Sequence, residues 1–196
     1  MEANNSFTEK EKMIAGQFYL ASDAELVRER LEARQVIHKF NNSLDVEERK
    51  QLVKKLFGTT GENIYLEPTL RLDYGYNIHV GENFYANFGA VFLDVCPIRI
   101  GKNCMLASNV QLLTAAHPLD PYERCDKGIE FGKPITLGDN CWLGGGVIII
   151  PGVTLGNNVV VGAGAVVTKS FGDNVVLAGN PAKVIKTITP KEQENK

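Results

Sequence analysis

A six-residue repeat in the second half of the chain constrains the fold more than any other feature of the sequence. Large aliphatic residues recur every six positions, and each follows a second apolar residue by two positions. The large residues are Leu137, Leu143, Ile149, Leu155, Val161 and Val167, and their partners are Ile135, Cys141, Val147, Val153, Val159 and Ala165. Residues two apart in a strand face the same side, so each repeat predicts a short strand with two side chains in one core.

A turn residue completes most repeats, three positions after the large aliphatic residue. The residues at this position are Asn140, Gly146, Gly152, Asn158, Gly164 and Ser170. Glycine and asparagine adopt positive φ at low cost, so the position predicts a sharp corner between strands. The same period is present upstream, in one series from Ile100 to Leu112 and another from Val80 to Ile98. A fixed period of this length predicts a parallel β-helix, a triangular prism with three short strands per turn.

The first 57 residues have a different character. They carry 20 of the 44 charged side chains, and only three of the 19 glycines precede Gly75. Apolar residues at helical spacing predict helices at about residues 9–19, 23–40 and 45–57. Ser22 and Glu25 match a capping box before the second helix, and Gly58 is a suitable C-terminal cap for the third. We expect a helical arm over residues 1–58 that packs on the open first coil and protects its edge. A sharper alternative is that the arm also closes over a substrate site.

Composition excludes several functional classes. The net charge of −2, from 21 basic and 23 acidic residues, opposes a nucleic-acid-binding role. No apolar run approaches the roughly 18 residues of a membrane span, and the polar N-terminus does not match a signal peptide. Cys96, Cys104 and Cys141 occupy smaller inward positions and are expected in the core, whereas Cys125 lies outside the repeat. Without a C-x-x-C spacing or an export signal, we expect reduced cysteines and a cytoplasmic protein.

The repeat is interrupted between Leu113 and Pro134, and this loop is the candidate functional segment. Solenoids accept insertions at their corners, and long loops in compact domains are usually functional or disordered. The loop opens with Thr-Ala-Ala-His-Pro, which places His117 at the junction of coil and loop, with Pro118 restricting its backbone. We therefore expect a mainly β chain: a helical arm (1–58), a β-helix (59–188) with loop 113–134, and a polar tail (189–196).

Several segments together resemble the hexapeptide-repeat sugar O-acetyltransferases. These segments are EKEKMIAGQFY, DYGYNIHVGENFYANFGAVFLDVCPIRIGKNCMLAS, AAHPLDP, GKPITLGDNCWLGGG and GNPAKVIK. The resemblance covers nearly the whole chain and is closer to the maltose branch than to the galactoside branch. It implies a left-handed β-helix, a homotrimer with active sites between subunits, and direct transfer of an acetyl group from acetyl-coenzyme A to a sugar hydroxyl, without a metal. The left hand comes from the resemblance alone, because parallel crossovers are usually right-handed.

The resemblance also implies roles for individual residues. His117 is the general base, in keeping with the ability of imidazole to accept a hydroxyl proton near pH 7, and Asn87 lies beside the reacting groups. The implied acceptor contacts are Asp73, Tyr85, Asn87 and Asp94. The implied acetyl-coenzyme A contacts are Asn87, Ala107, Trp142, Gly145, Ala163, Thr168, Lys169, Lys183 and Lys186. Trp142 precedes an inward-facing leucine, so it should point outward and form a wall of the site.

Departures from the galactoside branch bear on the acceptor. Asp73 stands where galactoside acetyltransferases have serine, which favours a maltose- or glucose-type acceptor. Ala21 stands where they have a sugar-binding aspartate, so acceptor contacts from the helical arm are in doubt. Arg30 matches an arginine in the helical arm of the galactoside acetyltransferases, but it is explained equally well as an ordinary charged residue on the surface of a helix.

Other functions remain open at this stage. The acceptor could be a galactoside or another glycoside. A zinc carbonic anhydrase shares this β-helix and needs three histidine ligands. His79 and His117 are spaced suggestively, but position 122 is tyrosine and His38 lies in a predicted helix. A purely structural β-helix is opposed by the histidine at the loop junction and by the coenzyme-type C-terminal segment.

Overall fold

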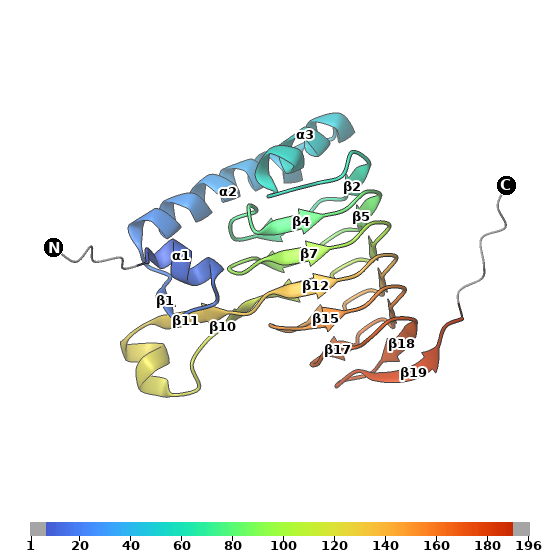
Figure 1. Cartoon of the computed structure of the whole chain (residues 1–196). Helices are drawn as coiled ribbons and strands as arrows, with labels where there is room; N and C mark the ends of the chain where they lie inside the picture. Colours follow the sequence, from blue (N-terminus) through green and yellow to red (C-terminus); the bar gives the residue numbers. More distant parts are fainter. Residues whose placement is uncertain (1–6, 190–196) are drawn as a thin grey trace.

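The computed structural model describes residues 7–189 and shows a prism of stacked strands with helices across one end (Figure 1). The helices are α1 (Glu9–Ile14), α2 (Ala24–Asn42) and α3 (Val46–Leu56), with a short π-helical turn, η1, at Tyr122–Asp126. Within residues 7–189, no helix has the length and apolar character needed to cross a membrane. Most of the expected polar tail lies outside the described residues.

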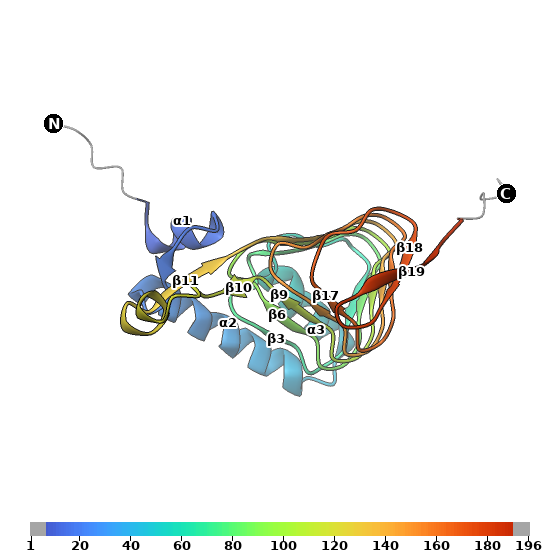
Figure 2. The ribbon, with the colours of Figure 1, turned by 90° about the horizontal axis from the view of Figure 1, so that it is seen from below.

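Three mainly parallel sheets form the sides of the prism, here called faces I, II and III (Figure 2). Face I contains β4 (Ile78–Val80), β7 (Ile98–Ile100), β12 (Ile135–Leu137) and β15 (Thr154–Leu155). Face II contains β2 (Ile64–Leu66), β5 (Phe84–Ala86), β8 (Met105–Leu106), β13 (Trp142–Leu143), β16 (Val160–Val161), β18 (Val175–Ala178) and the antiparallel β19 (Lys183–Thr187). Face III contains β3 (Arg71–Leu72), β6 (Val91–Leu93), β9 (Gln111–Leu113), β14 (Ile148–Ile149) and β17 (Val166–Val167).

The repeat residues fill the prism as the sequence predicts. Every large and small member of the two series between Ile135 and Val167 is at most 2% exposed. The predicted corner geometry is confirmed at five of the six corner residues, which have φ between 58° and 86°. Ser170 is the exception: it lacks a positive φ, and its hydroxyl instead accepts a hydrogen bond from the Thr154 amide at 2.9 Å. The expected β-helix is therefore confirmed.

Asparagines join neighbouring coils at the corner between faces I and II. Four hydrogen bonds form a ladder, each from the Nδ2 of one asparagine to the Oδ1 of the asparagine on the next coil, at 2.7–3.0 Å. The members of this ladder are Asn83, Asn103, Asn140, Asn158 and Asn174. All five have φ of 58–60°, so one residue type supplies both the corner and the bond between coils.

The helical arm covers the open end of the first coil (Figure 1). Ile37 and Phe40 of α2 and Val53 of α3 are buried in the same core as the strands of the prism. The expected packing of the arm on the first coil is confirmed.

Helix α1 is shorter than the sequence predicts. It ends at Ile14 rather than near Tyr19, because Gly16 adopts a φ of 73° just after the last turn. Tyr19 and Leu20 then form strand β1, which pairs with β11 (Ile129–Gly132). This segment therefore joins a sheet where the sequence predicts the last turn of the helix.

The helix caps also differ in detail from the prediction. Asp23, rather than Ser22, caps α2: its carboxylate accepts hydrogen bonds from the amides of Glu25 and Leu26. Gly58 follows the end of α3 without a positive φ. Glycine is required at this position for steric reasons, because a Cβ on residue 58 would lie 2.3 Å from the carbonyl oxygen of Tyr76.

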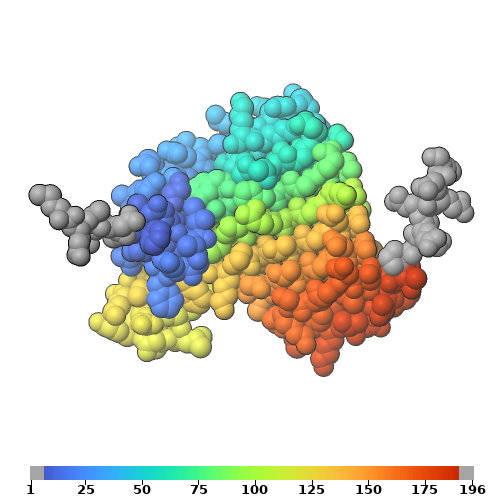
Figure 3. All heavy atoms as spheres, in the orientation of Figure 1, coloured from blue at the N-terminus to red at the C-terminus, as the bar shows by residue number. Residues whose placement is uncertain are grey.

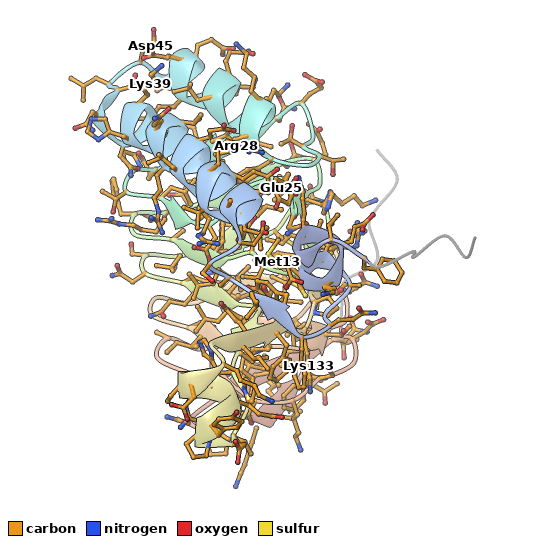
Figure 4. The ribbon with its side chains drawn as sticks, turned by 90° about the vertical axis from the view of Figure 1, so that its left-hand side faces the viewer. Met13, Glu25, Arg28, Lys39, Asp45 and Lys133 are labelled. Carbon is orange, nitrogen blue, oxygen red and sulfur yellow. The ribbon has the colours of Figure 1, made fainter. Side chains whose placement is uncertain are left out.

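The interrupting loop forms a hairpin that joins the arm. Strands β10 (Ala115–Ala116) and β11 (Ile129–Gly132) pair antiparallel, and β11 pairs on its other side with β1 (Tyr19–Leu20). The chain enters the loop from β9 on face III and leaves it for β12 on face I, so this sheet projects from the III/I corner (Figure 2). Figure 4 views this side, with α1 and its Met13 between α2 and the projecting sheet.

Candidate active site

The predicted site residues lie at two different corners of the prism. The III/I corner and its hairpin carry Asp73, Asp94, His117, Thr168 and Lys169, and the II/III corner carries Asn87, Ala107, Gly145 and Ala163. The two corners lie at opposite ends of the strands of face III. A strand and its turn span roughly 15 Å at the rise of an extended chain, so the corners are about that far apart. Across residues 7–189, no side-chain hydrogen bond or ion pair joins the two sets. One chain therefore does not assemble them.

Asp94 supports the III/I corner from inside. It is fully buried, and its carboxylate accepts hydrogen bonds from the amides of Asp73, Tyr74 and Gly75 at 3.0, 2.9 and 2.7 Å. Burial raises the pKa of Asp94 to about 7 in spite of these donors. The buried carboxylate thus shapes the turn that presents Asp73, and its expected contact with an acceptor stays a prediction.

Asp73 and Arg30 connect this corner to the arm. Burial raises the pKa of the half-buried Asp73, while the positive charges of Arg30 and Arg34 on α2 act to lower it. Arg30 donates to the hydroxyl of Tyr74 at 2.6 Å and to the carbonyl of Ala21 at 2.7 Å. Arg30 therefore joins α2 to the site, which distinguishes it from an ordinary surface charge.

His117 leaves the prism at the end of β10. Its ring is exposed, and Nδ1 lies 3.5 Å from the carbonyl oxygen of Ile129 on the neighbouring strand. Pro118 behind it is buried, which anchors the backbone of the histidine. The carbonyl favours a proton on Nδ1, and this tautomer leaves Nε2 free to accept a proton from a ligand.

Glu130 is a site residue that the sequence reasoning missed. It lies on β11, and burial raises its pKa, while the nearby His117 and Arg30 lower it and Asp73 raises it. The hairpin thus brings a second carboxylate beside His117 and Asp73. Nothing in the local sequence separates Glu130 from other acidic residues of the loop, because its position depends on pairing with β1.

The II/III corner is built from small residues. Ala107 and Gly145 are half-buried and Ala163 is exposed, so few side chains cover the backbone along this edge. A Cβ on Gly144 would lie 2.6 Å from the amide nitrogen of Ala163, so glycine is required for the coils to stack this closely. Asn87 is the first of the predicted site residues along this corner. Its Oδ1 accepts a hydrogen bond from the amide of Phe88, and its Nδ2 has no hydrogen-bond partner in the described part of the chain.

The remaining predicted coenzyme contacts lie elsewhere on the surface. Lys183 and Lys186 are exposed on β19, at the end of face II. Thr168 and Lys169 are exposed at the III/I corner, across face III from Gly145. The predicted coenzyme contacts are therefore spread over three separate parts of the surface of one chain.

Two of the outer faces are apolar. The outward positions of face II form an in-register column of Tyr65, Tyr85, Met105, Trp142, Val160 and Val176. Trp142 is 53% exposed, as predicted, and the rings of Tyr65 and Tyr85 stack with centroids 6.0 Å apart. Face III presents Val91, Leu93, Leu113, Ile148 and Val166, together with the polar Arg71 and Gln111 in the same register column, whereas face I presents His79, Arg99, Thr136 and Thr154. Apolar columns of this extent are typical of contact surfaces.

The residues of the zinc alternative are not gathered at one place. Nδ1 of His79 lies 3.1 Å from the hydroxyl of Thr59, and burial followed by the charge of Arg99 lowers the pKa of His79. No group of three or more His, Cys, Asp or Glu side chains suited to a metal ion occurs between residues 7 and 189.

Comparisons with known families and proteins agree with this architecture. Residues 12–61 match the maltose acetyltransferase hexapeptide capping motif, and residues 134–169 match the bacterial transferase hexapeptide, six repeats. A putative acetyltransferase of Dictyostelium discoideum is 70% identical over 190 residues, covering 97% of this chain and 100% of that protein. Galactoside O-acetyltransferase of Escherichia coli (strain K12) is 41% identical, covering 93% of this chain and 91% of that protein.

Solved structures show the same fold. A maltose O-acetyltransferase from Clostridium difficile 630 is 54% identical with a TM-score of 0.93, covering 95% of this chain and 100% of that one. A galactoside acetyltransferase in complex with coenzyme A is 39% identical with a TM-score of 0.87, covering 94% and 92%. With these structures the left-handed parallel β-helix expected from the sequence is confirmed.

Proposed function

The chain belongs to the hexapeptide-repeat acetyltransferase family that includes the maltose and galactoside O-acetyltransferases, and we propose that its acceptor is a maltose- or glucose-type sugar. It is a coenzyme A-dependent acetyltransferase with acetyl-coenzyme A as co-substrate. The single observation that carries the acceptor proposal is the placement of Asp73, Glu130 and His117 at the III/I corner: Asp73 follows β3, and Glu130 lies on β11, which pairs with the strand that leads to His117. Carboxylates accept hydrogen bonds from sugar hydroxyls, and they flank the group proposed as the base.

In the proposed reaction, the acceptor hydroxyl attacks the thioester carbonyl carbon while Nε2 of His117 removes its proton. The carbonyl oxygen becomes an oxyanion, and the free Nδ2 group of Asn87 is available to donate to it. Collapse of the tetrahedral intermediate breaks the carbon–sulfur bond. The imidazolium of His117 returns the proton to the departing thiolate, so the products are the acetylated sugar and free coenzyme A.

We also propose a cyclic homotrimer in which the III/I corner of one copy meets the II/III corner of the next. Two observations support it: neither corner alone holds the set of site residues, and faces II and III are both apolar on the outside. A contact between two different faces is heterologous, and such contacts close into rings when the rotation permits. The polar face I would then remain in water.

The coenzyme would lie across this contact. Ala107, Gly145 and Ala163 of one copy leave the backbone open to the pantetheine arm, and Thr168 and Lys169 of its neighbour are available on the other side. Lys183 and Lys186 offer positive charge to the phosphates, as point charges without the bidentate geometry of arginine. Tyr85 and Trp142 would form walls next to the II/III corner.

The test is acetyl transfer measured by release of free thiol from acetyl-coenzyme A, with maltose, glucose and a galactoside as acceptors. We expect turnover with maltose or glucose. His117→Ala should lower kcat by about 10²- to 10⁴-fold, the usual contribution of a general base, while sedimentation shows an unchanged assembly. His38→Ala is the matched control, because His38 is an exposed histidine on α2, away from the hairpin. Near-normal turnover by His117→Ala would overturn the assignment of the base, and preference for the galactoside would overturn that of the acceptor.

A further inference from the structure

Tyr19 of the arm lies opposite Glu130 in the projecting sheet. Strands β1 and β11 are antiparallel, and Tyr19 pairs directly with Glu130 in their register. Residues opposite each other in an antiparallel pair have Cβ atoms about 4.5–5.5 Å apart and side chains on the same face. The arm therefore brings an aromatic hydroxyl to the carboxylate that neighbours His117.

The hydroxyl of Tyr19 is a buried donor without a conventional partner. Tyr19 is 2% exposed and packs in a small cluster with Met13, Leu26, Tyr74 and Val95. Its oxygen makes no hydrogen bond of standard geometry to any residue that the structure describes. Burial and then the negative charge of Glu130 raise the pKa of Tyr19, so the hydroxyl keeps its proton. Buried hydroxyls are nearly always paired, and Glu130 is the residue directly opposite Tyr19 in the strand register.

Four residues on four elements affect the ionisation of Glu130. His117 follows β10, Arg30 lies on α2, Asp73 follows β3, and Tyr19 lies on β1. His117 and Arg30 favour the ionised carboxylate, whereas burial and Asp73 oppose ionisation. Burial leaves the pKa of Glu130 above its usual value, and a neutral donor next to the carboxylate acts to lower that pKa.

We propose that Tyr19 is a positioning residue for acetyl transfer, whose hydroxyl donates to the Glu130 carboxylate and so holds that carboxylate beside His117. The inference rests on the proposed function, because it takes His117 as the base. It gives the helical arm a part in the active site besides covering the end of the prism.

The expected effect of losing the hydroxyl follows from the charges. The interaction with Tyr19 lowers the pKa of Glu130, so its removal raises that pKa and the carboxylate becomes protonated at higher pH. The imidazole then has less negative charge beside it on the acidic side of the profile. Less negative charge beside the ring stabilises less well the imidazolium that forms as His117 takes the hydroxyl proton, so the ring is a weaker base. The acidic limb of kcat/KM should therefore move to lower pH, and the plateau should fall.

The experiment uses the full chain and four variants: Tyr19→Phe, Glu130→Gln, the double variant and Phe18→Ala. Tyr19→Phe removes one oxygen and keeps the ring in its cluster. We expect it to lower kcat roughly three- to tenfold, the worth of one net hydrogen bond, with little change in KM for acetyl-coenzyme A. Its acidic limb should move toward lower pH, in the direction of the larger shift of Glu130→Gln. In the Glu130→Gln background, Tyr19→Phe should change neither kcat nor the limb.

Phe18→Ala is the matched control for a merely structural effect. Phe18 adjoins Tyr19 and packs edge-to-face on Phe131 at 5.5 Å, so its removal loosens the contact between arm and loop without touching the hydroxyl. We expect its acidic limb to stay at the wild-type position. The melting temperature of Tyr19→Phe should fall only slightly, because the net contribution of the single hydrogen bond to Glu130 that it removes is small.

An unchanged acidic limb in Tyr19→Phe would overturn the inference, as would an equal effect of Tyr19→Phe with and without Glu130. If Glu130→Gln does not fold, the positions of the acidic limbs of Tyr19→Phe and Phe18→Ala are compared instead. A shift in Tyr19→Phe alone supports the inference, and equal positions overturn it. Failure of the proposed function gives a different result. An active His117→Ala variant would show that His117 is not the base. An inactive His117→Ala variant, together with an unchanged acidic limb in Tyr19→Phe, would overturn only the inference about Tyr19.

Discussion

At the scale of single residues, the corners between faces I and II show how one side chain meets two demands. Asn140 has φ of 58°, accepts from Asn103 at 3.0 Å and donates to Asn158 at 2.9 Å. Asn140→Gly loses the two ladder bonds but keeps the conformation without strain. Asn140→Ala loses the bonds and also places a Cβ in the left-handed region, so it should be less stable than the glycine variant by about 1–2 kcal/mol. Urea unfolding at fixed protein concentration measures this order, and equal stabilities would contradict it.

Single residues also differ in how well the sequence predicts their place in the structure. The inward residues and the corner residues repeat with a fixed period, so each is identified by its neighbours in the chain. Asp94 and Glu130 have no such pattern. The burial of Asp94 follows from three amides of a turn on the preceding coil, and the place of Glu130 follows from its pairing with Tyr19. Both depend on contacts between segments far apart in the sequence.

At the scale of elements, the arm stabilises the prism by covering its first coil. Phe40 of α2 is 1% exposed in the shared core, whereas Leu44, just beyond the helix, is 94% exposed. Phe40→Ala should therefore lower the free energy of unfolding by about 3–5 kcal/mol, the usual cost of emptying a buried phenylalanine site. Leu44→Ala is the control and should leave stability within about 0.5 kcal/mol. Similar losses in both variants, measured by urea unfolding, would show that the arm does not share the core.

Element boundaries were predicted where local signals dominate and missed where tertiary pairing does. The start of α2 near Asp23 and the end of α3 before Gly58 follow from caps and apolar spacing. The strands of the loop could not be predicted, because β10 and β11 have no repeat and form a sheet only with β1 of the arm. The early end of α1 did carry a local signal in Gly16. Figure 3 shows the result: the first part of the arm lies against the loop at the left, and the rest of the arm runs across the top of the prism.

At the scale of the whole molecule, the site is divided. His117 and Asp73 lie at one corner and Asn87 at another, with face III between them. In the trimer that we propose, the outward apolar residues of faces II and III would form the contact that brings these corners of two copies together. The central claim is therefore that each active site takes His117 from one copy and Asn87 from the next.

Subunit mixing between His117→Ala and Asn87→Ala tests this claim most directly. Each variant alone should be nearly inactive. In trimers assembled at random from equal amounts, a site that takes His117 from one variant and Asn87 from the other arises with probability one half times one half. The mixture should thus recover about a quarter of wild-type activity. If mixed trimers form, as mass spectrometry can verify, and activity does not recover, both residues act within one chain and the account is wrong.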